Sequence, residues 1–190
     1  MILHSGNFND ITIFPSQDTS VVFNLFSYLN NNLSENGIIP TWNFHALYGQ
    51  RFEYWLTQFS PVMILCSYFG KIINSNDNYN LYLLSIFIEK TIFIYGAYLL
   101  CKKLDLDRKI IFLTLCTFIF TWIWSTAIST NFRALYTYPF FLLFGFEFLK
   151  NGKLSNIILS GLSLAVTMVG TVGYYAPLIL YHFIIYSIGI

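Results

Sequence analysis

Charged side chains are scarce in this chain of 190 residues. They make up 10% of the sequence, whereas hydrophobic residues make up 56% and aromatic residues 20%. A soluble domain carries about 25% charged residues, so this chain has too few to cover a water-facing surface. The composition excludes an ordinary soluble domain and predicts an all-α integral membrane protein.

Other features are scarce as well. The formal net charge is +1, so no excess of positive charge indicates nucleic acid as a partner. The cysteines Cys66, Cys101 and Cys116 lie in or beside apolar runs, without CxxC spacing or a nearby histidine cluster. We interpret them as small buried hydrophobes, not as disulfide or metal sites. No basic stretch followed by an apolar core opens the chain, so we recognise no signal peptide.

Apolar runs of membrane-spanning length, by contrast, fill the chain after residue 78. A helix rises about 1.5 Å per residue, so crossing a core about 30 Å thick takes about 20 apolar residues. About five transmembrane helices are predicted, at Leu81–Cys101, Ile110–Ile128, Ala134–Leu149, Leu154–Gly170 and Tyr174–Ile190. A sixth run, Pro61–Ile73, is too short for a span and fits an interfacial or re-entrant helix.

Basic residues in two loops predict the orientation. The loop 102–109 contains four of them and the loop 150–153 two: Lys102, Lys103, Arg108, Lys109, Lys150 and Lys153. Two predicted spans separate these loops, so both lie on one side, which the positive-inside rule makes cytoplasmic. Residues 1–58 hold Arg51 as their one Lys or Arg. We therefore expect residues 1–78 to form an extracytoplasmic and interfacial segment, and residues 79–190 a transmembrane region.

The segment from Ser20 to Leu33 has helical periodicity. Its apolar residues gather on one side, while Ser20, Asn24, Ser27 and Asn31 take the other. This pattern predicts an amphipathic helix along the bilayer with its apolar face in lipid. Thr19 or Ser20 would cap it, and Asn36-Gly37 would end it. A second aromatic stretch, residues 52–59, is predicted to lie on the bilayer in the same way.

Asp18 lies just before this helix and is the first candidate for chemistry. A carboxylate beside lipid headgroups can act as a general base or a metal ligand on a lipid-linked substrate. The alternative is that Asp18 simply caps the helix. Asp10 competes for the same role with less local context.

Further ionisable residues follow the turn at Pro40. Arg51 suits a substrate phosphate, His45 a phosphate or a metal, and Glu53 belongs to the same predicted substrate-binding group. The alternative is that they are loop charges on a solvated face. Glu89 and Lys90 lie within a predicted span, where ionisable groups usually face protein or water. Adjacent helical residues do not face each other, so they are not a simple pair. Function and packing both remain open for them.

At these residues the chain resembles a known family. Asp18, the amphipathic helix, the turn Gly37-Ile38-Ile39-Pro40-Thr41-Trp42-Asn43, Gly49 and the run Gln58-Phe59-Ser60-Pro61 follow one another. This order is similar to the first extracytoplasmic loop of the GT-C superfamily of polytopic glycosyltransferases, and most of all to YfhO-like bacterial membrane proteins. Gln17 stands where the family has a glycine. The small-residue run Gly161–Ala165 with Gly170 also resembles a helix of the family, although Thr171-Val172-Gly173 replaces its closing polar motif.

The resemblance implies a fold and an activity. The fold is a multi-helix core in the bacterial cytoplasmic membrane, with interfacial helices in the first outer loop. The activity is transfer of a sugar from a polyprenyl-phosphate donor to an extracytoplasmic acceptor. Asp18 matches the first-loop aspartate, which in such enzymes acts as the catalytic base or helps to bind a divalent cation such as Mg or Mn. The donor sugar and the metal requirement are not identified by the sequence.

Family members are longer and begin with a helix that this sequence does not show. We therefore expect this chain to be the front piece of a longer protein, to need the remainder as a partner, and to be inactive alone. Two alternatives stay open: a non-catalytic membrane protein such as a transporter component, and an inactive remnant of a glycosyltransferase. A transporter would more often show helices broken at mid-membrane.

Overall fold

A computed structural model describes residues 17–43, 50–51, 59–73, 75, 77–120 and 134–168. The helices are α1 (Gln17–Asn36), α3 (Pro61–Ile72), α4 (Asn78–Lys103), α5 (Arg108–Phe120), α8 (Tyr138–Asn151) and α9 (Leu154–Met168), and the short 3-10 helix η1 (Ala134–Thr137) precedes α8. Two short strands, β1 (Trp42–Asn43) and β2 (Gln50–Arg51), pair antiparallel. Apart from this pair the regular structure described is helical, which agrees with the all-α prediction.

Helix α4 is the longest element. Asp77 caps its start by accepting from the backbone amide of Asn80 at 3.0 Å, and Lys102 and Lys103 lie in its last turn. Its 26 residues extend about 39 Å, and the predicted span Leu81–Cys101 lies inside it. Within the described ranges, α4 is the one helix long and apolar enough to cross a bilayer. Most of its apolar stretch is not buried by the other described helices.

The remaining predicted spans correspond to shorter helices. Helices α5, α8 and α9 have 13, 14 and 15 residues, or about 20 to 23 Å, less than a bilayer core of about 30 Å. Parts of the first and third of these predicted spans, and the whole of Tyr174–Ile190, lie outside the described residues. Many of the large apolar side chains on these helices are exposed, and α5 has no buried residue.

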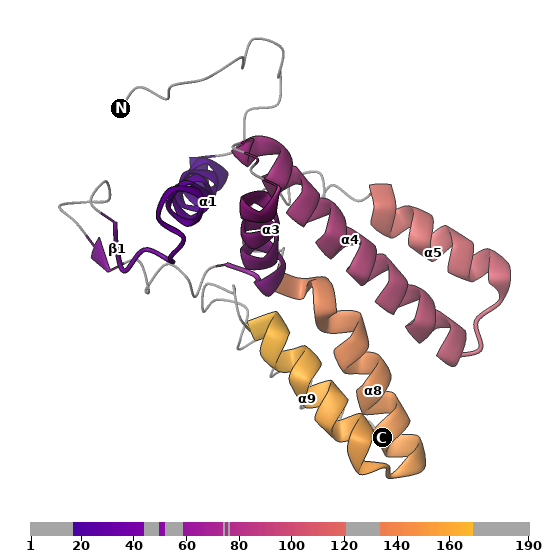
Figure 1. The fold of residues 1–190 in the computed structure, drawn as a ribbon. Helices are drawn as coiled ribbons and strands as arrows, with labels where there is room; N and C mark the ends of the chain where they lie inside the picture. The colour runs from indigo at the N-terminus through magenta and orange to yellow at the C-terminus, as the bar shows by residue number, and fades with distance from the viewer. Residues whose placement is uncertain are drawn as a thin grey trace.

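The long helices form an elongated bundle (Figure 1). Helix α5 returns antiparallel along α4, where Phe93 and Phe118 pack edge to face with ring centroids 5.2 Å apart. Helix α8 packs against α4 and α9, and an ion pair joins Lys103 at the end of α4 to Glu147 near the end of α8. Both basic loops therefore lie at one end of the bundle, as the sequence predicts.

Helix α1 contacts the other end of α4 and crosses the direction of the bundle (Figure 1). Its side chains Val22, Leu25, Phe26, Leu29 and Leu33 are buried in one cluster with Phe59 and Met63 of the α3 region and with Leu81 and Tyr82 of α4. The prediction that this apolar face lies in lipid is wrong, because α3 and α4 cover it. The predicted end is confirmed: Gly37 has φ of 74° and its amide donates to the Leu33 carbonyl at 3.1 Å.

Helix α3 runs back along the first half of α4. Gly70, near its end, faces Leu81, while Ser60, just before its start, bonds to Glu89. Its 12 residues extend about 18 Å, less than the thickness of a bilayer core, and the expectation that this run does not span stays a prediction. Its antiparallel packing on α4 fits the re-entrant alternative better than a helix lying flat on the bilayer.

Gly96 is expected to be needed for the contact between α4 and α8. A Cβ atom at this position would lie 2.6 and 2.8 Å from ring carbons of Phe140, closer than van der Waals contact permits. We expect Gly96→Ala to lower the free energy of unfolding by about 1–3 kcal/mol through overpacking. Thermal unfolding of the purified protein in detergent measures the change.

The matched control is Gly161→Ala in α9, where an added Cβ meets no atom within 4 Å. Alanine favours a helix over glycine by about 1 kcal/mol, so this variant should be as stable as the wild type or more so. Equal melting temperatures for the two variants would contradict the close approach of α8 to α4.

Candidate functional site

Asp18 belongs to helix α1. Because α1 already includes Gln17, Asp18 is a helical residue and not a cap. Thr19 and Ser20 are helical as well, so the predicted capping roles do not hold. Helix α1 thus holds Asp18 at the end of the bundle that lies away from the basic loops.

The turn after α1 is fixed from two sides. The Tyr28 hydroxyl donates to the carbonyl of Trp42 at 2.7 Å, and the Lys71 amine donates to the carbonyl of Gly37 at 3.4 Å. Strand β1 pairs with β2 so that Trp42 lies opposite Arg51. The strand pair holds Arg51 beside the segment that follows α1. Its side chain is exposed.

His45, Glu53 and Asp10 lie outside the described residues, so the structure neither joins them to Arg51 nor separates them from it. In the described ranges, no three His, Cys, Asp or Glu side chains gather closely enough to hold a metal ion.

A buried polar contact that the sequence analysis missed lies halfway along α4. The Ser60 hydroxyl donates to the carboxylate oxygen of Glu89 and accepts from the backbone amide of Met63 at 3.1 Å. Ser60 is 2% exposed and Glu89 is fully buried. One serine thus caps α3 and binds the acidic side chain that α4 carries into the bundle.

The start of α8 comes close to the same level. Tyr136 of η1 is buried in one cluster with Val62 and Cys66 of α3, and side chains of α4 from Leu84 to Phe93 pack around them. Pro139 stands near the start of α8, as Pro61 does in α3. Two short helices therefore begin near the middle of α4, and each covers one half of it.

A second group of hydroxyls joins η1 to α9. The hydroxyls of Thr137 and Thr167 lie 2.7 Å apart, and both bond to the carbonyl of Ser163, at 3.0 and 2.9 Å. Thr137 consequently makes no side-chain capping bond to α8. These bonds satisfy polar groups inside an apolar bundle and fix where α8 begins.

Lys90 turns away from Glu89, as the spacing on a helix requires. Its amine donates to the backbone carbonyl of Ile119 on α5 at 3.0 Å. The prediction that Glu89 and Lys90 do not form a simple pair agrees with these contacts. Glu89 faces protein, and Lys90 links α4 to α5.

Sequence signals existed for part of this arrangement. A serine followed by proline marks the first turn of a helix, and this signal identifies Ser60 as a cap. Nothing local indicates that its hydroxyl bonds to a residue 29 positions later.

The cysteines agree with the prediction for Cys66 and Cys101, which are buried, whereas Cys116 is partly exposed.

Comparison of the chain with protein-family profiles, with curated proteins and with solved structures finds no match in any of the three.

Proposed function

We propose that this chain is part of a polytopic membrane glycosyltransferase of the GT-C type, which transfers a sugar from a polyprenyl-phosphate donor to an extracytoplasmic acceptor. The observation that carries the proposal is the location of Asp18 on α1, at the end of the bundle opposite the basic loops. With those loops cytoplasmic, α1 and its residue Asp18 lie on the side of the membrane where such acceptors occur.

Membrane insertion is supported by the length of α4 and by the surface of the other helices. The two ionisable residues in the middle of α4 form hydrogen bonds within the protein. Glu89 accepts from the Ser60 hydroxyl, and Lys90 donates to the backbone carbonyl of Ile119. Exposed apolar side chains cover α5 and α9, among them Phe112, Leu113 and Leu162. In this proposal α5, η1 with α8, α9 and residues 174–190 contribute four further membrane-embedded segments, and α3 is re-entrant.

The proposed chemistry needs one base. The acceptor hydroxyl oxygen attacks the anomeric carbon of the donor sugar, and the bond from that carbon to the phosphate oxygen breaks. Polyprenyl phosphate leaves with the electron pair, and the Asp18 carboxylate takes the proton of the hydroxyl. Arg51, His45 and Glu53 are the proposed substrate-binding residues, with the Arg51 guanidinium suited to the donor phosphate.

Sugar transfer tests this proposal directly. Native membranes that contain the protein are incubated with radiolabelled polyprenyl-phosphate sugars, and membranes from a gene deletion strain serve as the control. We expect label to move from the lipid to an acceptor only in the membranes that contain the protein. Equal transfer in both membranes, across the donor sugars tried, would overturn the proposal.

The proposed orientation predicts a labelling pattern. Single cysteines at Asn7, Asn32 and Asn151 in a cysteine-free background are treated with an impermeant thiol reagent in intact cells. We expect labelling at residues 7 and 32, which are extracytoplasmic in the proposal, and protection at residue 151 beside the cytoplasmic loop. Permeabilised cells give the control for reactivity. The reverse pattern would contradict the orientation.

One observation favours a second candidate, a transporter component. Helices α3 and α8 begin near the middle of α4, close to buried Glu89, and short helices starting at mid-membrane are typical of transporter binding sites. In that case Glu89 would carry a proton or cation, and Glu89→Gln would abolish ion-coupled uptake. In the glycosyltransferase Glu89 is structural, so the same variant should retain sugar transfer.

A further inference from the structure

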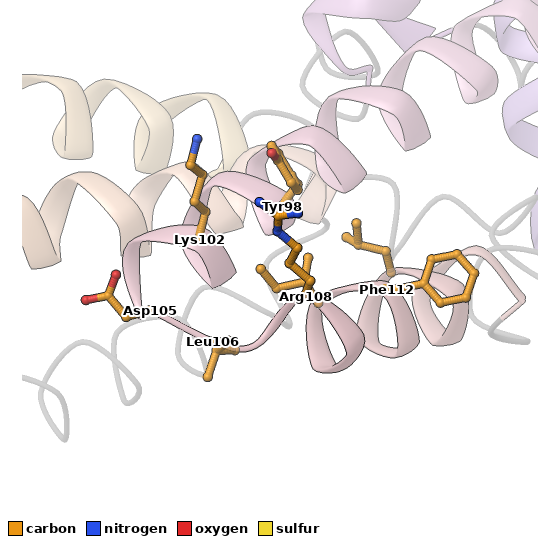
Figure 2. Close-up of a pocket in the computed structure, with 8 residues that line it drawn as sticks. Tyr98, Lys102, Asp105, Leu106, Arg108 and Phe112 are labelled. Atoms are coloured by element: carbon orange, nitrogen blue, oxygen red, sulfur yellow. The ribbon is translucent and has the colours of Figure 1, made fainter.

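A cavity opens beside the turn between α4 and α5, at the end of the bundle that holds the basic loops. Its volume is about 620 Å³, and eight residues line it: Tyr98, Lys102, Asp105, Leu106, Arg108, Ile111, Phe112 and Leu115 (Figure 2). None of them belongs to the site proposed for sugar transfer. The cavity lies at the opposite end of α4 from helix α1.

Two cations, Lys102 and Arg108, line this cavity. Lys103, next to them in sequence, is paired with Glu147, but Lys102 and Arg108 form no ion pair within the described part of the chain. The Arg108 side chain reaches from the start of α5 toward Tyr98 on α4, whereas the Asp105 carboxylate points away from it (Figure 2). The lining thus carries two positive charges and one negative charge, with the negative charge turned aside.

The backbone of the turn closes α4 and leads directly into α5. Asp105 has φ of 53°, and the amides of Asp105 and Leu106 close α4 by donating to the carbonyls of Lys102 and Cys101 at 3.2 and 3.3 Å. Helix α5 then begins at Arg108, so its N-terminal end, where the helix dipole is positive, faces the turn. The C-terminal end of α4, where the dipole is negative, faces the same turn, so the positive charge available to an anion comes from the Lys102 and Arg108 side chains.

The rest of the lining is apolar. Leu106, Ile111 and Leu115 contribute hydrocarbon, and Phe112 is 70% exposed beside the charged end. A phosphate at Lys102 and Arg108 would therefore have a hydrocarbon wall next to it. A free phosphate ion has no hydrocarbon to pack against this wall. A phospholipid has a phosphate for the charged part of the cavity and an acyl chain for the apolar part.

We infer that this cavity binds the headgroup of an anionic phospholipid in the leaflet at the basic end of the bundle, with the phosphate at Lys102 and Arg108 and an acyl chain along α5. Basic pockets at membrane surfaces hold anionic headgroups through such contacts. A zwitterionic lipid carries no net charge and gains less from the two cations. This site is independent of sugar transfer.

The test measures binding of fluorescent phosphatidylglycerol and phosphatidylcholine to the full chain, purified in detergent at low salt. Each cation near the surface contributes about 5-fold to binding an anionic lipid, so K102Q/R108Q should weaken phosphatidylglycerol binding about 30-fold. Phosphatidylcholine binding should be weak in wild type and variant alike. Both proteins should melt at the same temperature, because neither side chain is buried.

Two further variants distinguish lipid binding in this cavity from general electrostatic attraction of the lipid to basic residues. K150Q/K153Q removes the same charge from the other basic loop and should leave the affinity unchanged. Asp105→Asn keeps a residue that tolerates positive φ and removes the negative charge, so it should tighten binding.

Equal weakening by K102Q/R108Q and K150Q/K153Q would overturn the inference, as would equal affinity for the two lipids. Inorganic phosphate is the competing probe. If millimolar phosphate displaces the lipid completely, the cavity is a free-phosphate site and the assignment to a phospholipid is wrong. Persistence of lipid binding under those conditions supports it.

Discussion

Asp18→Asn is expected to lower the rate of sugar transfer about 10²- to 10⁴-fold, the usual contribution of a general base. Asparagine is close to aspartate in size but cannot accept the proton of the acceptor hydroxyl. The rate is measured in native membranes with saturating polyprenyl-phosphate sugar, and the amount of folded protein is quantified alongside. Loss of a carboxylate near a helix N-terminus costs about 0.3–1 kcal/mol, so the fold should persist.

Asp10→Asn is the matched control, because Asp10 is the one other aspartate in residues 1–58. It should retain near-normal transfer. Full activity in Asp18→Asn, with loss in Asp10→Asn, would assign the base to Asp10. Full activity in both variants would leave the proposed mechanism without a base from this segment.

Helix α4 illustrates what local patterns predict well. Its apolar run was long enough to be recognised by length alone, and Asp77 and the pair Lys102-Lys103 mark its ends in the sequence. The predicted span falls short of the helix by three residues at the start and two at the end (Leu81–Cys101 against Asn78–Lys103). Polar residues in those terminal turns continue a helix although they cannot lie in hydrocarbon, which explains the difference.

Helix α1 illustrates what such patterns leave open. Periodicity identifies which side chains need cover, and Val22, Leu25 and Phe26 are indeed buried. Periodicity does not say whether lipid or protein supplies the cover. Here α3 folds back along α4 and the pair offers an apolar surface, which cannot be read from residues 20–33.

In the candidate site, too, some features could be predicted from the sequence and others depend on how the helices pack. The resemblance selects Asp18 by its place before an amphipathic helix, and the structure adds the end of the bundle at which that helix lies. The contact of Ser60 with Glu89 depends on how α3 packs against α4, so it required coordinates. The burial of Tyr136 against Val62 links segments more than 70 positions apart and has no local signal.

Ser60→Ala is expected to have the largest effect on stability among the buried polar contacts. The change removes the cap of α3, which costs about 1 kcal/mol. It also deprives the buried Glu89 carboxylate of a donor, which costs about 1–3 kcal/mol more. The free energy of unfolding in detergent should therefore fall by about 2–4 kcal/mol. Thr91→Ala, an exposed change two residues after Glu89 on α4, should stay within about 0.5 kcal/mol of wild type.

A double-mutant cycle separates the two contributions of Ser60. Glu89→Leu alone leaves the Ser60 hydroxyl without its acceptor, whereas Ser60→Ala/Glu89→Leu removes both polar partners together. Because an apolar pair has no unsatisfied group, the double variant should lose less stability than the sum of the single variants, by about 0.5–3 kcal/mol. Strictly additive losses would mean that the hydroxyl acts on α3 alone, and that Glu89 is held in the bundle by its other contacts.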